Sequence, residues 1–177
     1  MITIREALAS ELAKVLQIER LAFNQDAEAE LVRQLLTDPS AQPVLSLLAF
    51  KDAEAVGYIL FSKVSVSGST LSASILAPLA VVPEAQNQGI GSQLVEQGIQ
   101  QLSQAGVGLV FVLGYPQYYS RFGFTPAGVL GFEAPYPIPD KHADAWMVQA
   151  LQPNIVGTVK GTVVCADVLN KPEYWIE

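Results

Sequence analysis

The sequence predicts a mixed α/β (α+β) fold, in which a mostly antiparallel central sheet contains one strand–helix–strand unit and is flanked by helices. Two runs rich in β-branched and aromatic residues, 44–50 and 56–66, are separated by a short polar turn, which is the pattern of an antiparallel hairpin. Farther along, an amphipathic stretch at 90–102 lies between two uninterrupted apolar runs, 77–82 and 109–113. Such runs are typical of strands covered on both faces, and the helix between them predicts that they are parallel.

Length and composition predict one compact domain over residues 1–177. Half of the 177 residues are hydrophobic and 15% are charged. The usual charged share is roughly 25%, so disorder and charge-rich solvated helices are disfavoured. The formal net charge is −7, which disfavours nucleic-acid binding because such surfaces gain affinity by neutralising phosphates. We therefore expect no nucleic-acid partner.

Cysteine and histidine usage limits the chemistry further. One cysteine and one histidine cannot form a disulfide framework or a Cys/His zinc cluster, so no metal site is expected. Charged side chains interrupt residues 1–16, which are therefore unlike a signal peptide. The longest apolar stretch, 71–82, is interrupted by serine and proline and is shorter than the ~20 residues of a membrane span. We expect no membrane partner and a cytoplasmic location.

The N-terminal part is predicted to contain a short strand and two helices. Ile2 and Ile4 alternate with polar residues, as in a strand. Ser10 is a suitable N-cap for a helix that runs to Phe23. A second helix follows, with leucines at helical spacing, and is expected to end at 38–40, where an aspartate precedes a proline.

A third strand at 71–82 is predicted to extend the hairpin into an antiparallel meander. Small polar residues at 67–70 form the turn before it. Pro78 falls inside this strand, although a proline cannot donate a hydrogen bond to a neighbouring strand. We therefore expect a bulge or a splayed edge at Pro78.

A polar loop with two glycines at 86–91 follows this strand and opens the amphipathic helix, which is expected to end at Gly106. The helix should pack on the sheet through one apolar stripe. The members of the stripe are Ile90, Leu94, Val95, Ile99 and Leu102.

The C-terminal part is predicted to be more irregular. A short aromatic helix is expected at 115–122, and a further strand begins after Gly123. A proline-rich loop is expected at 133–144. The last strands are expected at 146–151 and 156–168.

The glycine loop is a candidate phosphate site. A loop that follows a buried strand and opens a helix presents unpaired backbone N–H groups at the positive end of the helix dipole. A dinucleotide fingerprint would need glycine at Leu94 and a carboxylate near Phe111, and a Walker loop would need a lysine before Ser92. The sequence matches neither motif. An alternative is that the loop only closes a tight turn between strand and helix.

Two motifs resemble one family of acetyltransferases. The loop at 86–91, Gln-Asn-Gln-Gly-Ile-Gly, matches the pattern Gln/Arg-x-x-Gly-x-Gly/Ala of the acetyl-CoA pyrophosphate loop in the GCN5-related N-acetyltransferases, the GNAT family. The string at 119–124, Tyr-Ser-Arg-Phe-Gly-Phe, matches that family's Tyr-x-x-x-Gly-Phe pattern. The resemblance covers roughly 2–127, and the segments 79–84 and 113–119 resemble a bacterial branch of uncharacterised predicted acetyltransferases.

The resemblance implies a GNAT-like fold with acetyl-CoA as cosubstrate. The N-acetyltransferase core would cover 2–127, and 128–177 would form a C-terminal loop and strands. The pantetheine arm would pair with the backbone edge of the third strand, and the pyrophosphate would bind backbone N–H groups of the loop. Gln86 replaces the arginine that is frequent there, so modest affinity is expected. The implied cofactor-binding residues are Leu79, Ala80, Val81, Gln86, Asn87, Gln88, Gly89, Ile90, Gly91 and Ser92.

The resemblance also implies a reaction in which a neutral primary amine, from a small molecule or a protein, attacks the thioester directly. The tetrahedral intermediate would collapse with loss of CoA thiolate. Tyr119 would be the catalytic general acid that protonates this thiolate. Alternatively, Tyr119 only packs against Tyr118 and Phe122. The strand at 74–82 has no carboxylate where many relatives have a glutamate, so the general base is unassigned.

Other residues have two interpretations each. Glu28, Glu30 and Glu54 are candidate bases by position, but each also fits a surface charge, and a water could relay the proton. His142 fits an exposed turn or a base in the substrate pocket. Arg121 fits a helix surface or a contact with cofactor phosphate.

The remaining candidates concern packing, assembly and the acceptor. Cys165 fits a small buried apolar residue, whereas Trp146 and Trp175 fit the core or an oligomer interface. The acceptor would be bound by loops at 23–31 and 133–144. The low charge content and an exposed meander edge would suit a homodimer. Two other functions stay open at this point, a non-catalytic acyl-CoA sensor or interaction module and an unrelated nucleotide-binding α/β domain.

Overall fold

The computed structural model describes residues 1–176 and confirms the mixed α/β fold with a mostly antiparallel open sheet. The strands are β1 (Ile2–Glu6), β2 (Leu45–Lys51), β3 (Glu54–Val66), β4 (Ala73–Val81), β5 (Leu109–Leu113), β6 (Thr125–Pro126), β7 (Phe132–Glu133), β8 (Trp146–Ala150) and β9 (Gly161–Val164). The α-helices are α1 (Leu12–Phe23), α2 (Ala27–Thr37), α3 (Ile90–Gln104) and α4 (Pro116–Tyr119).

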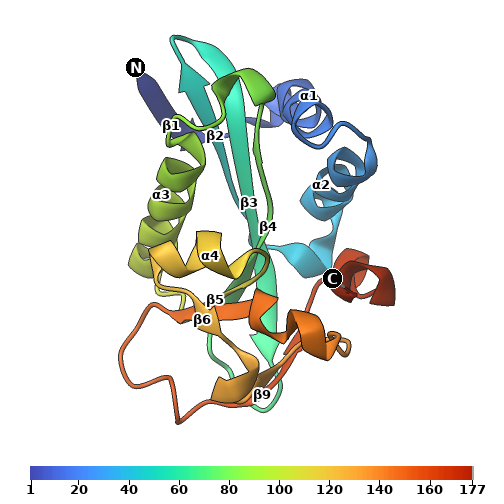
Figure 1. The fold of residues 1–177 in the computed structure, drawn as a ribbon, viewed down its shortest axis with the longest axis vertical. Helices are drawn as coiled ribbons and strands as arrows, with labels where there is room; N and C mark the ends of the chain where they lie inside the picture. Colours follow the sequence, from blue (N-terminus) through green and yellow to red (C-terminus); the bar gives the residue numbers. More distant parts are fainter. Residues whose placement is uncertain (177) are drawn as a thin grey trace.

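The sheet is the middle layer of three. Its main path has the strand order β1-β2-β3-β4-β5-β8-β6, while β9 pairs with the C-terminal end of β3 and with β7. Figure 1 shows α1 and α2 on one side of this sheet and α3 on the other. The core therefore fills two spaces, one on each face of the central strands.

The predicted meander is confirmed. Strands β1 to β4 pair antiparallel in sequence order, with β2 and β3 joined by the expected tight turn. The register between β3 and β4 shifts near Pro78, because Ile59 pairs with Leu79 whereas Phe61 pairs with Leu76. One residue of β3 is thus opposite two of β4, which is a β-bulge. The bulge at Pro78 is the one that the sequence predicted.

The helices bury the apolar faces that their periodicity predicts. In α3, the residues Ile90, Leu94, Val95 and Leu102 are buried against the sheet. Gly98 also lies on this face, close to the ring of Phe61 on β3. Within residues 1–176, no helix is both long and apolar enough to cross a lipid bilayer.

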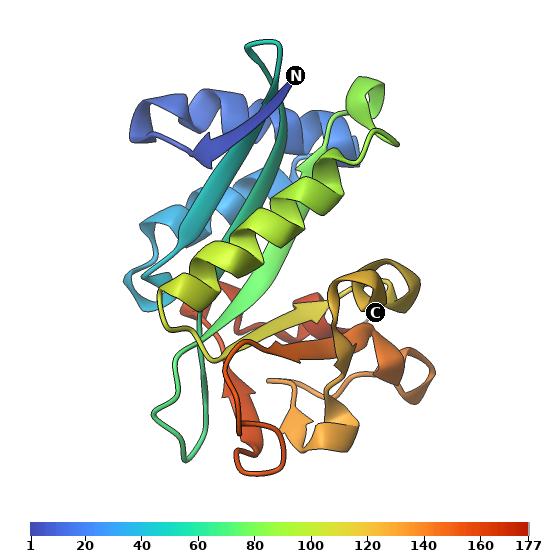
Figure 2. The ribbon, with the colours of Figure 1, turned by 90° about the vertical axis from the view of Figure 1, so that its left-hand side faces the viewer.

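The strands β4 and β5 are parallel, as predicted, but they pair only over their first residues. The pairing joins Ala73 to Leu109 and ends at Ile75 and Phe111. Beyond this point β4 continues beside β3, whereas β5 pairs with β8 on its other side. Figure 2 shows β4, in light green, and β5, in yellow, running apart in different directions. The sheet therefore opens between these two strands.

The C-terminal region differs from the prediction in one strand. The strand predicted at 146–151 is β8, but the long strand predicted at 156–168 is wrong, since only the short β9 forms there. The N–H of Thr158 donates to the carbonyl of Ile155 at 3.0 Å, which closes a turn. Gly157 and Gly161 adopt positive φ angles of 90° and 151° that interrupt an extended chain. The predicted loop at 133–144 also contains most of a 3-10 helix, Asp140–Ala145.

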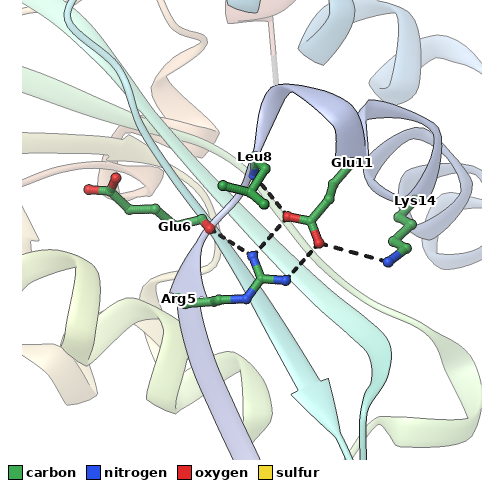
Figure 3. Close-up of polar contacts among 5 residues, drawn as sticks. All are labelled: Arg5, Glu6, Leu8, Glu11 and Lys14. Carbon is green, nitrogen blue, oxygen red and sulfur yellow. Dashed lines mark hydrogen bonds and ion pairs between the residues drawn. The ribbon is translucent and has the colours of Figure 1, made fainter.

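The beginning of α1 also differs from the prediction. Ser10 is not its N-cap, because a 3-10 helix, Ala9–Glu11, precedes α1. The carboxylate of Glu11 accepts hydrogen bonds from the N–H of Leu8 at 2.8 Å and from Arg5 at 2.8 and 2.7 Å (Figure 3). The hydrogen bonds from Arg5, followed by the one from Leu8, lower the pKa of Glu11 to about 2. A charged network therefore joins β1 to the start of α1.

Candidate active site

A cleft of about 1170 Å³ lies where β4 and β5 diverge. One wall of the cleft is formed by β4, by the loop before α3 with the first turn of α3, and by the segment from Leu113 through α4. The α1–α2 region contributes Phe23 and Glu28, and the C-terminal segment contributes Tyr174 and Trp175. Because α1 and α2 lie on the face opposite α3, the cleft reaches from one face of the sheet to the other.

Beyond Ile75, the edge of β4 that faces this cleft has no neighbouring strand within residues 1–176. The N–H of Val82 donates to the carbonyl of Val56 on β3 at 2.9 Å. Residues of an antiparallel strand direct their backbone groups alternately to the two sides. Ala80, two residues before Val82, therefore directs its backbone groups to β3, whereas Leu79 and Val81 direct theirs toward the cleft.

The side chain of Gln86 agrees with this orientation. Its Nε2 donates to the carbonyl of Val81 at 3.0 Å, from the side away from β3. Within the predicted set of strand residues, Leu79 and the N–H of Val81 thus face the cleft without a strand partner in the described chain, while the carbonyl of Val81 is hydrogen-bonded to Gln86. Ala80 is buried and directs its backbone groups to β3 instead.

The loop before α3 turns sharply and leaves backbone N–H groups of the first helical turn without a helical partner. Asn87 and Gly89 have positive φ angles of 62° and 79°, which turn the chain sharply into the helix. The first helical hydrogen bond runs from the N–H of Gln93 to the carbonyl of Gly89 at 3.1 Å. The N–H groups of residues 90–92 therefore have no partner within the helix and lie at its positive end.

Most of the predicted cofactor-binding residues line the cleft, and two do not. Those that line it are Leu79, Val81, Gln86, Asn87, Gly89, Ile90, Gly91 and Ser92. Besides Ala80, the exception is Gln88, whose side chain is held outside the cleft. Its Oε1 accepts a hydrogen bond from Lys51 at 2.6 Å, and its Nε2 donates to the carbonyl of Glu84 at 3.3 Å. Gln88 thus fixes the loop from outside.

Arg121 supplies positive charge to the same end of the cleft. Its guanidinium donates to Ser92 Oγ at 3.4 Å and lies 4.8 Å from the centre of the Tyr118 ring. Tyr118 in turn packs on α3 at Gly91, where an added Cβ would lie 2.7 Å from its hydroxyl oxygen. Within residues 1–176, Arg121 is the one lysine or arginine that lines the cleft. The structure therefore favours a role at the cleft over that of a plain surface cation.

Tyr119 lines the cleft from α4 and is mostly buried. Its ring packs edge-on against Tyr118 and Phe124, with centroid distances of 5.0 and 5.8 Å. It also covers Gly114, where an added Cβ would lie 2.5 Å from the ring. Burial, together with the neighbouring Tyr118, raises the pKa of Tyr119 well above its usual value. Its hydroxyl therefore keeps its proton at neutral pH.

The structure separates the other candidates. Glu28 and the half-buried His142 line the cleft, whereas Glu30 and Glu54 do not. Glu30 is exposed and forms an ion pair with Arg33. A single sequence could not distinguish among the three glutamates, because their positions relative to the cleft depend on contacts between distant segments.

The surroundings of Cys165 and of the two tryptophans indicate packing roles. Cys165 lies outside the cleft, and burial raises the pKa of its thiol to about 11. Trp146 stacks on Phe111 with a centroid distance of 5.2 Å and meets Trp175 edge-on at 5.6 Å. Both tryptophans are buried, so they belong to the core of the described chain.

One unusual residue, Glu19, has no signal in the sequence. It lies on α1 with no exposed surface, and neither carboxyl oxygen has a hydrogen-bond partner within residues 1–176. Its neighbours in sequence are helix formers, so only the folded structure identifies it as buried. Over the same residues, no three His, Cys, Asp or Glu side chains are grouped closely enough to hold a metal ion.

A family model described as an acetyltransferase (GNAT) domain matches residues 3–127. The chain belongs to the GNAT acetyltransferase family. This GNAT chain is 46% identical over 161 residues to YjhQ of Escherichia coli K12, which is named an uncharacterised N-acetyltransferase; the match covers 89% of this chain and 88% of YjhQ. It is 35% identical over 153 residues to YhbS of the same strain, which is also named an uncharacterised N-acetyltransferase. That match covers 86% of this chain and 89% of YhbS.

Solved structures agree with the family assignment. The crystal structure of YhbS from E. coli in complex with CoA has a TM-score of 0.87 and 32% identity, covering 96% of this chain and 92% of YhbS. A GNAT acetyltransferase from Brucella melitensis in complex with acetyl-CoA has a TM-score of 0.77 and 28% identity, covering 96% and 98%. The protein is thus an N-acetyltransferase of a bacterial GNAT branch. The family match excludes the alternative that the chain is an unrelated nucleotide-binding α/β domain.

Proposed function

We propose that this N-acetyltransferase uses acetyl-CoA and transfers its acetyl group to a primary amine of a small molecule or protein. The observation that carries the proposal is the opening between β4 and β5, with the helix N-terminus of α3 beside it. The two structures named above contain CoA or acetyl-CoA, which supports the same ligand here. The cleft is also large enough for a substantial part of such a ligand.

Acetyl-CoA, the acetyl donor, would bind along the opening between β4 and β5 and at the N-terminus of α3. The amide groups of the pantetheine arm would pair with Leu79 and Val81, as an added strand pairs with a sheet edge. The pyrophosphate would accept hydrogen bonds from the N–H groups of residues 90–92, with Arg121 supplying the nearby positive charge. The backbone groups of Leu79, the N–H of Val81 and the start of α3 are complementary to these two parts of the ligand, and Gln86 would have to release the Val81 carbonyl before that group could also pair.

The reaction we propose is direct transfer. The amine nitrogen attacks the thioester carbonyl carbon and forms a tetrahedral intermediate, whose C–S bond then breaks. The departing thiolate takes the proton of the Tyr119 hydroxyl, which the raised pKa keeps protonated. The proton lost by the amine goes to a carboxylate or to water, and Tyr119 regains its proton from solvent.

Calorimetric titration with acetyl-CoA, with NAD and ATP as controls, tests the donor. We expect saturable binding of acetyl-CoA alone. A second assay follows free CoA thiol with a panel of primary amines and tests turnover. Binding without amine-dependent thiol release would mean that the protein is an acyl-CoA sensor, and no acetyl-CoA binding by the folded protein would contradict the proposal as a whole.

A further inference from the structure

Glu19 is an unusual residue for a protein core. A buried carboxyl group without a hydrogen-bond partner is costly, and neither oxygen of Glu19 has one within residues 1–176. Burial, and to a smaller extent the negative charge of Glu28, raises its pKa to about 8. Glu19 therefore carries a proton at neutral pH and is close to ionisation. Packing alone does not require a carboxyl group here, because a glutamine or leucine would fill similar space.

The position of Glu19 connects it to the acceptor side of the cleft. Phe23, one helical turn later on the same face of α1, lines the cleft, and so does Glu28 at the start of α2. The titratable groups near Glu19 are Glu28 and, from the sheet, Tyr58. The hydroxyl of Tyr58 is bonded to Ser46 Oγ at 2.6 Å, so Glu28 is the group that connects Glu19 with the cleft.

The charges in the cleft are separated. Arg121 and the N-terminus of α3 lie on the donor side, whereas Glu28 approaches from the opposite face of the sheet. Gln25 Nε2 donates to both Glu28 oxygens, at 2.9 and 3.1 Å. This partner is neutral, and no lysine or arginine within residues 1–176 forms an ion pair with Glu28. Its negative charge is thus available to a ligand.

We propose that Glu28 binds the acceptor as an ammonium ion and that Glu19, which is fully buried on α1 and does not line the cleft, is a positioning residue that acts on this subsite through Glu28. The acceptor class is a small primary alkylamine that is cationic when it enters. The net charge of −7 favours the approach of such a cation. In this proposal the Glu28 carboxylate also accepts one ammonium proton, which leaves the nitrogen lone pair free to attack. This inference rests on the proposed function, since it concerns the acceptor of that reaction.

The test measures binding rather than turnover. We titrate three amines, butylamine, 1,5-diaminopentane and 2-phenylethylamine, into the free protein and into its CoA complex. For each amine, the alcohol with the same carbon skeleton is titrated in the same way. We expect at least one amine to bind about tenfold or more tightly than its alcohol, as for a hydrogen bond to a charged group. Glu28→Gln should remove this preference. Glu30→Gln, a nearby substitution on the same helix outside the cleft, is the control and should keep it.

The role of Glu19 has its own readout. In the wild-type protein, amine affinity should increase as the pH rises through about 8, because Glu19 ionises. Glu19→Gln keeps the shape of the side chain, and its amine affinity should not change over this range. Circular dichroism checks that each variant is folded. A Glu19→Gln variant that keeps the wild-type pH dependence would contradict the positioning role.

The outcomes separate this inference from the proposed function. If alcohols bind as well as amines, if no amine binds to either form, or if Glu28→Gln behaves like Glu30→Gln, the acidic subsite is overturned. These results leave acetyl-CoA binding unaffected. Loss of acetyl-CoA binding would instead contradict the proposed function, while amine binding by the free protein would still test the subsite.

Discussion

Tyr119 combines two properties that are hard to separate by inspection. Its ring packs against aromatic neighbours, and its hydroxyl belongs to a residue that lines the cleft. The raised pKa keeps the phenol protonated at neutral pH, so its hydroxyl carries a proton to donate and cannot act as a base, although the same shift makes it a weaker acid. We therefore expect Tyr119 to act on the leaving thiolate and not on the attacking amine.

Substitution of Tyr119 by phenylalanine separates the two roles, because the ring and its packing remain. We expect Tyr119→Phe to lower kcat by about ten- to a hundredfold, within the range for loss of a general acid, with acetyl-CoA affinity unchanged. Steady-state kinetics and calorimetry measure the two quantities. Tyr115→Phe, at an exposed residue of the cleft mouth, is the control. Unchanged kcat in Tyr119→Phe would mean that Tyr119 only packs.

Arg121 lines the cleft and is the cation that we propose for cofactor phosphate. Arg121→Gln should weaken acetyl-CoA binding by about tenfold, the loss expected for one charge-assisted hydrogen bond, while kcat changes little. The effect should decrease at high salt, because this side chain is exposed. Arg33→Gln, which removes a cation from α2, is the matched control. Equal acetyl-CoA affinities for the two variants would exclude Arg121 from the phosphate site.

Glu19 makes stability depend on pH. Its pKa is raised from 4.5 to about 8 in the folded state, so the unfolded chain releases this proton first as the pH rises. The contribution to stability is complete below pH ~4.5 and is lost toward pH ~8, with a slope of at most about 1.4 kcal/mol per pH unit. Glu19→Gln should therefore be more stable than the wild type at pH 8.

Urea unfolding at pH 5, 7 and 8.5 measures this difference. The two proteins should have similar stabilities at pH 5 and diverge as the pH rises. Glu54→Gln, at an exposed site at the start of β3, serves as the control for removing one negative charge. If the wild type and Glu19→Gln differ by a constant amount at all three values, the buried carboxyl group does not titrate in this range.

At the scale of elements, α3 is held close to β3 by a residue without a side chain. An added Cβ at Gly98 would lie 2.3 Å from Cε2 of Phe61, a fully buried ring. We expect Gly98→Ala to destabilise the protein by about 1–2 kcal/mol, because overpacking exceeds the gain in helix propensity. Gln100→Ala, on the exposed side of α3, should have almost no effect, and Phe61→Leu should partly rescue Gly98→Ala. Chemical denaturation measures the stability of the wild type, Gly98→Ala, Gln100→Ala and the double variant that combines Gly98→Ala with Phe61→Leu.

The elements that the sequence predicted well are those with local signals. The hairpin of β2 and β3 has alternating residues and a tight turn, and α3 has a clear apolar stripe between two apolar strands. The proline at 78 predicted the bulge, because it cannot take part in regular strand pairing. The strand predicted at 156–168 was wrong because its β-branched residues suggested extension, whereas glycine conformations interrupt it.

At the scale of the whole molecule, the cleft joins segments that are far apart in sequence. The side that we propose for acetyl-CoA comes from neighbouring elements, β4 to α4 and the residues just after it, so motifs in one stretch of sequence could predict most of it. The side that we propose for the acceptor includes Glu28 near the start of the chain and Tyr174 near the other end. No local pattern predicts that these two meet. The burial of Glu19 depends on the same long-range packing.

Asp38 connects the two distant segments. Its carboxylate accepts hydrogen bonds from the N–H and hydroxyl of Ser40 and, at 3.1 Å, from the N–H of Val168. The hydroxyl oxygen of Ser40 accepts one from the N–H of Asp167 at 2.8 Å. The end of α2 is thus bound to the segment that carries Tyr174 and Trp175 into the cleft.

Removal of this link should loosen the C-terminal segment. We expect Asp38→Ala to cost about 1–3 kcal/mol, because the part-buried hydrogen bonds from Ser40 and Val168 to a charged carboxylate are lost. Amide hydrogen exchange should become faster at Asp167 and Val168 but remain unchanged in β2 and β3. Asp26→Ala, which removes an exposed carboxylate of the α1–α2 connection, is the control. Unchanged exchange at both amides would mean that other contacts hold this segment.

The division of the cleft has a consequence for biosynthesis. The proposed donor side would be complete once the chain has been made through Arg121, but Tyr174 and Trp175 follow about 50 residues later. At translation rates of about 5–20 residues per second, the ribosome needs roughly 3–10 s to add them. During that interval the nascent chain contains every residue that would hold acetyl-CoA and lacks one wall for the amine. Acetyl-CoA would therefore be able to act as a cotranslational folding ligand, ahead of any encounter with an acceptor.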